Sequence, residues 1–160
     1  MNKKIKSQEE LIRIVADYKR KCKTVVSTNG IFDMFNIGHL MALQGAKAYG
    51  DILIVGINSD DSTKMIRGVR HPIIPQQDRM EIISELSCVD FVYIFDDIYP
   101  CEFLNKLKPS IHVKGGNWKF KYCPEIKVVE NNGGKFAYTG YEFATDDIIK
   151  KIFNAYEKRF

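Results

Sequence analysis

Residues 28–39 place a glycine, a histidine and polar side chains at a spacing that suits a phosphate-binding turn. Gly30 allows a ligand to approach the backbone closely. Asn36, Gly38 and His39 fall where a helix is expected to begin, and the free N–H groups and dipole of a helix start attract anions. A His39 imidazole that donates to a phosphate oxygen would stabilise charge that develops in a transition state. This segment therefore predicts phosphate binding, with His39 as a candidate catalytic donor.

Strands and helices must hold this turn in place. Short β-branched or apolar runs predict five strands, at residues 24–27, 51–57, 89–95, 110–114 and 135–139. Helical patterns run from a capping box at Ser7 to the basic run near residue 19, and at 40–49, 77–87, 100–107, 125–131 and 146–156. Strands that alternate with helices imply parallel βαβ units joined by right-handed crossovers. The expected fold class is α/β, a single Rossmann-like three-layer domain with a parallel sheet of about five strands.

In such sheets, ligands bind beyond the carboxyl ends of the strands. The turns expected to face a ligand therefore follow Ser27, Ile57, Phe95, Lys114 and Thr139. The turn at 28–39 is the first of them.

The 160 residues have the composition of one ordinary globular domain. We divide the chain into an N-terminal helix at 1–23, a Rossmann-like core at 24–143 and a C-terminal helix at 144–160. There is no run of about 18 apolar residues and no secretory signal, so we expect a cytoplasmic protein with no membrane partner. A net charge of +4 is too mild for a nucleic-acid binder. The four cysteines form no Cys-x-x-Cys pair, so no metal ligands are predicted in the chain.

The turn at 28–39 resembles the Gly-x-Phe-Asp-x-x-His-x-Gly-His signature of the nucleotidyltransferases of the cytidylyltransferase-like superfamily. The matching residues are Gly30, Phe32, Asp33, Gly38 and His39. Further matches follow in order along nearly the whole chain, at residues 58–62, 67–68, 71–72, 78–79, 89–90, 109–118 and 132–135. This succession is most similar to the adenylyltransferase domain of the D-glycero-β-D-manno-heptose 1-phosphate adenylyltransferases.

The resemblance implies an enzyme in which a sugar 1-phosphate oxygen attacks the α-phosphate of a nucleoside triphosphate, with Mg²⁺ assisting. Pyrophosphate leaves and a nucleotide-sugar forms. The expected partners are the triphosphate (ATP by preference, with CTP or GTP also open) and a sugar phosphate. The family commonly forms dimers, so a homodimer is a further expectation. The kinase domain fused to bifunctional members is absent from these 160 residues, so a separate protein is expected to make the sugar 1-phosphate.

The resemblance also implies roles for single residues. His39 and Asn36 are expected to hold the triphosphate, and Lys114 is a third candidate catalytic residue. The remaining residues expected to bind the nucleotide are Thr28, Asn29, Gly30, Phe32, Asp33, Gly38, Gly115, Asn117 and Thr145.

Cations and one aromatic ring are the candidates to contact the phosphates and the second substrate. Lys64, Arg67 and Arg70 follow the second strand, and a solvated loop is the alternative for them. Arg79 opens a predicted helix, where a cation is poorly placed against the dipole, which favours a ligand-facing role. Trp118 offers a stacking face next to the glycine pair of the fourth turn.

Four segments depart from the family pattern. Asn36 replaces the first histidine of His-x-Gly-His, and its alternative role is to cap the helix through its side-chain oxygen. His71 stands where the family usually has Arg, and Asn117 where it has Asp. The usual Ser-Thr-Thr before the last helix is Ala144-Thr145-Asp146 here, which puts a negative charge where a polyphosphate would sit.

Two other functions stay open from the sequence. One is a cytidylyltransferase acting on glycerol phosphate or another small phosphate, because Asn117-Trp118 partly resembles the Asp-Trp of those enzymes. The other is a protein that binds a nucleotide without turnover. The departures at Asn36, Ala144 and Asp146 favour that interpretation, whereas the intact His39, Lys114 and Arg79 oppose it.

Overall fold

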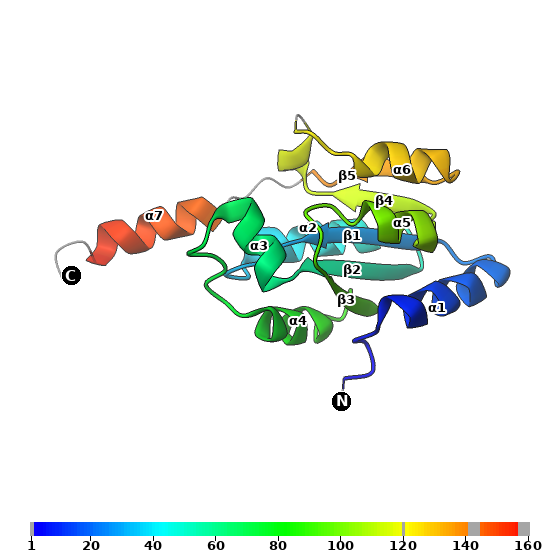
Figure 1. The fold of residues 1–160 in the computed structure, drawn as a ribbon, viewed down its shortest axis with the longest axis horizontal. Helices are drawn as coiled ribbons and strands as arrows, with labels where there is room; N and C mark the ends of the chain where they lie inside the picture. Colours follow the sequence, from blue (N-terminus) through cyan, green and yellow to red (C-terminus); the bar gives the residue numbers. More distant parts are fainter. Residues whose placement is uncertain (1, 120, 141–144, 157–160) are drawn as a thin grey trace.

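Five parallel strands form one sheet in the computed structural model, which describes residues 2–119, 121–140 and 145–156. The strands are β1 (Val25–Gly30), β2 (Ile52–Asn58), β3 (Phe91–Phe95), β4 (Ile111–Lys114) and β5 (Lys135–Tyr138). Their order across the sheet is β3-β2-β1-β4-β5 (Figure 1). The register pairs Asn29 with Gly56 on one side of β1 and Ser27 with His112 on the other. The predicted α/β class and parallel sheet are confirmed.

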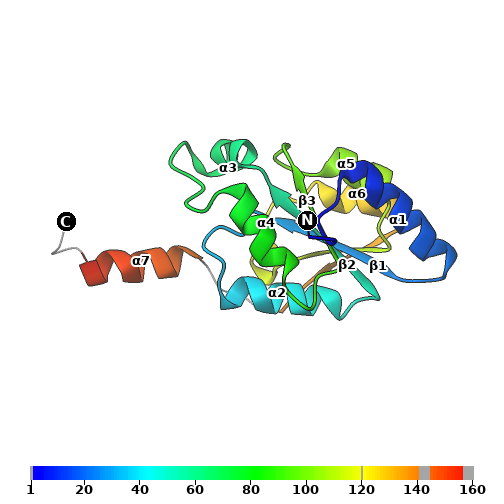
Figure 2. The same ribbon diagram turned by 90° about the horizontal axis from the view of Figure 1, so that it is seen from below.

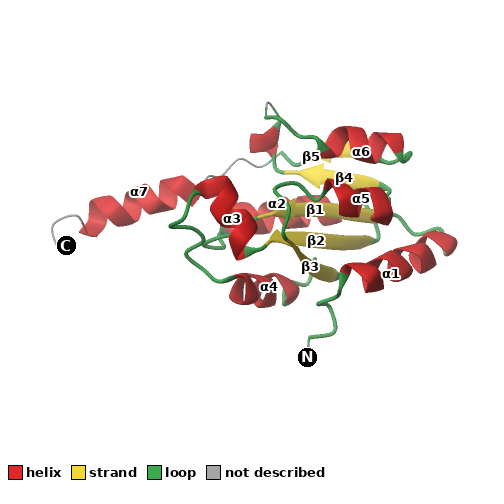
Figure 3. Ribbon diagram, viewed as in Figure 1, coloured by secondary structure: helices red, strands yellow, loops and turns green. Residues whose placement is uncertain are grey.

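Helices connect and flank these strands (Figure 3). The helices are α1 (Gln8–Arg20), α2 (Ile37–Lys47), α3 (Asp60–Arg67), α4 (Gln76–Ser84), α5 (Cys101–Leu107), α6 (Glu125–Asn131) and α7 (Thr145–Tyr156), with a short 3-10 helix, η1 (Gly116–Trp118). The predicted capping box opens α1, because Ser7 and Glu10 each accept a hydrogen bond from the other's backbone N–H. The predicted helices are confirmed, with ends shifted by a few residues.

The helices cover both faces of the sheet, which explains why the strands are so apolar (Figure 2). On one face, Leu43 of α2 and Ile83 of α4 pack with Val55 and Val92 of the strands. On the other face, Leu11 of α1 and Phe103 of α5 belong to a second cluster of buried residues. Helix α6 lies on the same side as α5, against β5 (Figure 2). These layers are the three expected of a Rossmann-like domain.

Helix α3 was not predicted, because no apolar stripe marks it in the sequence. The residues that it buries are the polar Ser62 and Thr63, while Met65 is 61% exposed. The start of α3 nevertheless has the capping residue and acidic first turn that are typical of a helix start. The Ser59 hydroxyl accepts a hydrogen bond from the Ser62 backbone N–H at 3.1 Å, and acidic residues fill the first turn.

The strand order creates a switch point between β1 and β4. The chain leaves β1 toward β2 and later returns to the opposite side of β1 to form β4. Open α/β sheets bind ligands beyond the strand ends at such a point. Asn29 near the end of β1 and Lys114 at the end of β4 flank it. Helix α7 begins near this edge and extends away from the body of the domain, with none of its described side chains buried (Figure 1).

Candidate active site

A pocket of about 520 Å³ opens at the carboxyl ends of β1, β2 and β4, where the sequence placed it. The predicted site residues that line it are Thr28, Asn29, Gly30, Phe32, Asp33, Gly38, His39, Arg67, Lys114, Gly115, Trp118 and Thr145. Four predicted residues are not among its described lining residues: Asn36, Lys64, Arg70 and Arg79. Asn117 belongs to η1, and its side chain lies outside the described part of the structure.

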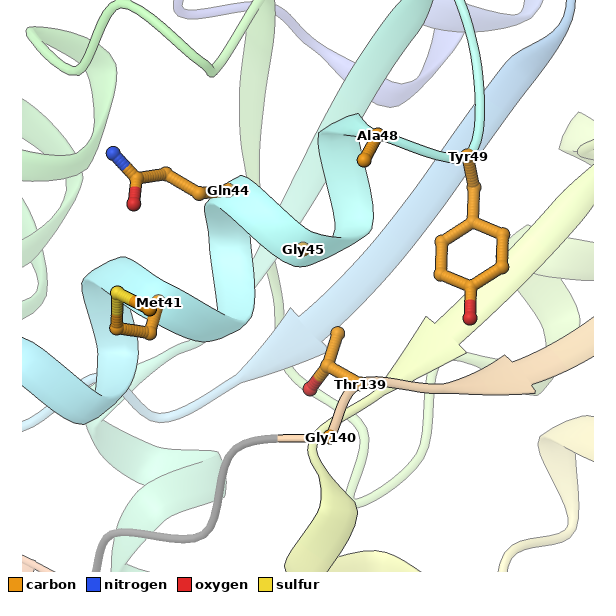
Figure 4. A pocket seen from close by; sticks show the side chains of 7 residues that line it. All are labelled: Met41, Gln44, Gly45, Ala48, Tyr49, Thr139 and Gly140. Carbon is orange, nitrogen blue, oxygen red and sulfur yellow. The ribbon is translucent and has the colours of Figure 1, made fainter.

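A second hollow, also of about 520 Å³, lies between α2 and the end of β5 (Figure 4). It is lined by Met41, Gln44, Gly45, Ala48, Tyr49, Thr139 and Gly140. None of these residues carries a charge or belongs to the predicted site. The pocket at the switch point is therefore the candidate active site.

His39 lies in the first turn of α2, between two aromatic rings. Its ring centroid is 5.5 Å from that of Phe32 and 5.7 Å from that of Phe35. Burial lowers the pKa of His39 to about 4, and the nearby charge of Asp33 opposes this shift only in part. Its Nδ1 atom is buried and has no hydrogen-bond partner among the residues described. At neutral pH, His39 is thus a neutral imidazole that can donate one N–H to a ligand.

We expect the free energy of unfolding to fall as the pH drops from about 6.5 to about 4. Unfolded imidazoles take up protons near a pKa of about 6.5. Burial lowers the pKa of both folded His39 and folded His112, so the unfolded state binds more protons and gains stability. Thermal unfolding at about pH 7.5 and about pH 5 measures this loss. His39→Gln should shrink the difference, and an unchanged difference would contradict a buried neutral His39.

Asn36 caps α2, as the alternative reading of the sequence had it. Its Oδ1 accepts hydrogen bonds from the backbone N–H groups of Gly38 and His39, at 2.9 and 3.4 Å. Its Nδ2 donates to Met34 O and to the Thr145 hydroxyl, at 3.1 and 3.2 Å. Both ends of the amide are therefore engaged, so Asn36 caps α2 and joins it to the start of α7, while its predicted contact with the triphosphate stays a prediction.

Asp33 lines the pocket, but its carboxylate is used to hold a loop. The backbone N–H groups of Ile73 and Ile74 donate to its two oxygens at 2.8 and 2.9 Å. His71 Nδ1 lies 3.8 Å from Asp33 Oδ2. Asp33 thus fixes the loop before α4 against the turn between β1 and α2.

Arg79 is predicted to contact the substrate, but its side chain is 1% exposed and its guanidinium donates to partners inside the protein. The guanidinium donates to Asp60 at 2.8 Å and to Asn58 O at 2.9 Å. It also donates to Ile74 O at 2.9 Å and to Ile31 O. The cation at the start of α4 is thus offset by a carboxylate and three carbonyls, not by a ligand.

The cations that follow β2 separate into two groups. Arg67 lines the pocket, and its Nη1 lies 3.9 Å from Oδ1 of Asp146. Lys64 is exposed and pairs with Asp61 at 2.8 Å, which raises its pKa. Arg70 is exposed and is not among the described residues that line the pocket. Of the three cations, Arg67 is the one placed at the pocket, and the phosphate contacts of Lys64 and Arg70 stay predictions.

The turn after β4 presents an aromatic ring between two ammonium groups. Lys114 Nζ lies 4.4 Å and Lys121 Nζ 5.3 Å from the centroid of the Trp118 ring. Lys114 is 2% exposed and pairs with Glu125 at 3.1 Å, so its charge is already matched inside the protein. Lys121 is exposed and also lines the pocket.

Several residues that line the pocket were not predicted from the sequence: Thr63, Ile66, Ile98, Tyr99, Lys121 and Ile149. Tyr99 follows β3, in a turn expected to face a ligand, but no motif singled it out. Its ring packs edge-on against Tyr122, with centroids 5.9 Å apart. Asp146 lines the pocket as its position suggested, whereas Ala144 lies outside the described residues.

Among the described residues, no three His, Cys, Asp or Glu side chains are grouped closely enough to hold a metal ion. Within the same ranges, none of the helices has the length and apolar character needed to cross a lipid bilayer.

Residues 27–149 match the model of a protein family described as Cytidylyltransferase-like. Among curated proteins, the chain is 37% identical over 155 residues to "Bifunctional protein HldE" of Geobacter sulfurreducens, covering 96% of this chain and 32% of that protein. It is 46% identical over 137 residues to the protein of the same name from Nitratiruptor sp., covering 82% of this chain and 30% of that protein. The chain thus spans about a third of the length of these relatives.

Two solved structures share the fold. The lipopolysaccharide core biosynthesis protein from Thermoplasma volcanium has a TM-score of 0.65 and 27% identity, covering 76% of this chain and 99% of that chain. The pantoate-β-alanine ligase from Francisella tularensis has a TM-score of 0.61 and 13% identity, covering 88% of this chain and 68% of that chain. The second likeness is one of fold alone.

Proposed function

The chain belongs to the cytidylyltransferase-like family, and we propose that it transfers the adenylyl group of ATP to a heptose 1-phosphate, with release of pyrophosphate. The observation that carries this proposal is the pocket at the switch point, which brings Gly38 and His39 together with Gly115 and Arg67. Support for the acceptor comes from the motif resemblance, from relatives named HldE and from a structural neighbour described as a lipopolysaccharide core biosynthesis protein.

The proposed reaction exchanges one phosphoanhydride bond for another. An oxygen of the sugar phosphate attacks the α-phosphorus of ATP, and the bond from that phosphorus to the oxygen bridging the β-phosphorus breaks. The attacking oxygen is already ionised at neutral pH, because the second pKa of a phosphate ester is about 6. No side chain has to remove a proton, so the protein must supply positioning and charge neutralisation.

The pocket residues can supply both. Neutral His39 donates an N–H to a phosphate oxygen as charge develops there. Arg67, at the end of α3, and Lys121, in the segment after β4, both bring positive charge to the pocket. The glycines at 38 and 115 leave room for the phosphates to approach the backbone.

Magnesium fits this pocket as an ion carried in by the nucleotide. Mg²⁺ keeps several waters and is commonly held by substrate phosphates and one or two carboxylates, so a cage of three protein ligands is not required. Asp146 is the exposed carboxylate that lines the pocket, with 63% of its side chain accessible. When bound, the ion would neutralise charge on the phosphates, and Asp146 would hold it.

We expect Asp146→Thr to tighten ATP binding about two- to fivefold when magnesium is absent, the range of an exposed charge pair. The change removes a like charge from the pocket and releases Arg67, whose Nη1 lies 3.9 Å from Asp146. With magnesium present, the gain should disappear, because the ion offsets the carboxylate. Calorimetric titration with ATP, with and without EDTA, measures both affinities. Equal affinities in the two proteins under both conditions would mean that Asp146 faces away from the phosphates.

Pyrophosphate release tests the proposed function. The protein is incubated with magnesium, D-glycero-β-D-manno-heptose 1-phosphate and each of ATP, CTP, GTP and UTP in turn, and with ATP alone as the control. Release with ATP that depends on the acceptor supports the proposal. Faster release with CTP would replace adenylyl by cytidylyl transfer. No release with any pair of substrates would leave a nucleotide-binding protein without turnover.

A further inference from the structure

A series of buried polar side chains runs from β1 across β4 to α6. Ser27 and Asn29 lie on β1, His112 and Lys114 on β4, and Glu125 at the start of α6. Asn29 and Lys114 also line the pocket. Buried polar networks are costly unless their donors and acceptors are matched, so the direction of each hydrogen bond can be worked out from the partners.

Lys114 fixes the orientation of the Asn29 amide. An ammonium group can only donate, and Lys114 Nζ lies 2.9 Å from the side-chain atom of Asn29 that faces it. That atom is therefore the oxygen, Oδ1, which also lies 3.2 Å from His112 Nε2. Because the oxygen is engaged twice inside the protein, the NH₂ group is the part of Asn29 left to face the pocket.

The orientation of Asn29 also determines which ring nitrogen of His112 carries the proton. Asn29 Oδ1 can only accept, so His112 Nε2 must carry the hydrogen. His112 Nδ1 then accepts a hydrogen bond from the Ser27 hydroxyl, 2.7 Å away. Burial, together with the charge of Lys114, lowers the pKa of His112 well below its ordinary value, so the ring is neutral.

Glu125 anchors the other end of the network. Its side chain is 0% exposed, and its Oε1 accepts from Lys114 at 3.1 Å. Its Oε2 lies 3.2 Å from Cys123 Sγ. Burial and the adjacent Glu125 charge raise the pKa of the Cys123 thiol to about 12, so the thiol stays protonated and donates. The charge of Lys114 is thus neutralised and held in one place.

We propose that Glu125 and His112 are positioning residues that hold the Asn29 amide with its nitrogen toward the pocket, where it donates a hydrogen bond to an oxygen of the bound nucleotide. The identity of this ligand rests on the proposed function, whereas the direction of the network does not. Asn29 leads directly into the turn that carries His39, which places its donor on the nucleotide side. In this arrangement, Lys114 orients Asn29 through its charge and does not itself neutralise a phosphate.

Nitrogen-15 NMR of the imidazole rings tests the direction of the network without a ligand. We expect His112 to be neutral at about pH 7 and to carry its proton on Nε2. If the Asn29 amide were reversed, its NH₂ group would donate to His112 Nε2 and the ring proton would sit on Nδ1. An Nδ1–H tautomer would therefore overturn the proposal, whether or not the protein is an adenylyltransferase.

A double-mutant cycle tests whether Glu125 acts through Asn29. Glu125→Gln is expected to weaken ATP binding about tenfold while kcat stays within about threefold, since one neutral hydrogen bond to the nucleotide is lost. Asn29→Ala should weaken binding at least as much, and the double variant no more than Asn29→Ala alone. Glu130→Gln, on the exposed side of α6, is the matched control and should change neither value.

Calorimetric titration with ATP and steady-state kinetics give the two measurements. Independent losses that add in the double variant, or a fall in kcat with unchanged ATP affinity, would overturn the role of Glu125. If Glu125→Gln fails to fold, Cys123→Ala removes only the donor to Glu125 Oε2 and should weaken ATP binding in the same direction. A wild-type protein that binds no ATP would remove the proposed function and the nucleotide as the ligand of Asn29, while the His112 tautomer still decides the network.

Discussion

His39→Ala is expected to lower kcat by about 10²–10³-fold, the usual cost of removing one hydrogen-bond donor to a developing oxyanion. His39 is held between Phe32 and Phe35 in the first turn of α2, and burial lowers its pKa to about 4. A ring held in this way donates a neutral N–H without having to reorganise during the reaction. The rate should therefore stay flat between about pH 7 and pH 8, where the acceptor phosphate is ionised and the His39 imidazole neither gains nor loses a proton.

The melting temperature without ligand separates this role from a structural one. Nδ1 of His39 has no hydrogen-bond partner among the described residues, so the alanine variant breaks no internal hydrogen bond at that atom. Pyrophosphate release and thermal unfolding are measured on the same samples, with His39→Asn as a variant that keeps a donor. A large loss of stability with near-normal kcat would make His39 a packing residue.

Arg79→Met should destabilise the fold by about 3–5 kcal/mol, because a partly buried carboxylate and three carbonyls lose their buried donor. The guanidinium is 1% exposed and joins Asp60 to the carbonyls of Ile31, Asn58 and Ile74. These carbonyls belong to three segments around the pocket, so their loss of a shared partner should loosen the site as well as the core. Urea unfolding of both proteins gives the difference in the free energy of unfolding.

Arg79→Lys is the informative companion variant. Lysine keeps the charge for Asp60 but lacks the planar fork of donors that reaches several acceptors at once. Its stability should therefore lie between those of wild type and Arg79→Met. A methionine variant as stable as wild type would contradict the structural role assigned to Arg79.

The fold could be predicted because the sequence carries its signals locally. The strands are nearly continuous apolar runs because helices bury both faces of the sheet, as for Leu53, Ile54 and Val55 of β2. Parallel order then places the strand ends at one edge, so the pocket was expected where it lies. The family match also confirms the predicted family, because residues 27–149 fit the Cytidylyltransferase-like model.

The contacts of single side chains could not be predicted, because their partners are distant in the sequence. Asn36 meets Thr145 from α7, and Lys114 meets Asn29 from β1, contacts that no local pattern encodes. Arg79 was expected to face a ligand because a cation opposes the dipole at a helix start, yet Asp60, contributed by α3, offsets that charge. The motif thus predicts where the pocket lies, whereas tertiary packing determines which of its residues line the pocket and which pair inside the protein.

The most direct test of nucleotidyl transfer at this pocket is ³¹P NMR of the reaction itself. The protein is mixed with ATP, magnesium and D-glycero-β-D-manno-heptose 1-phosphate, and the phosphorus signals are followed with time. If the adenylyl group is transferred, the sugar phosphate signal is replaced by the coupled pair of a sugar–nucleotide diphosphate, with one pyrophosphate released per molecule formed. ATP that stays intact, or that yields AMP and pyrophosphate while the sugar phosphate signal is unchanged, would contradict nucleotidyl transfer at this pocket.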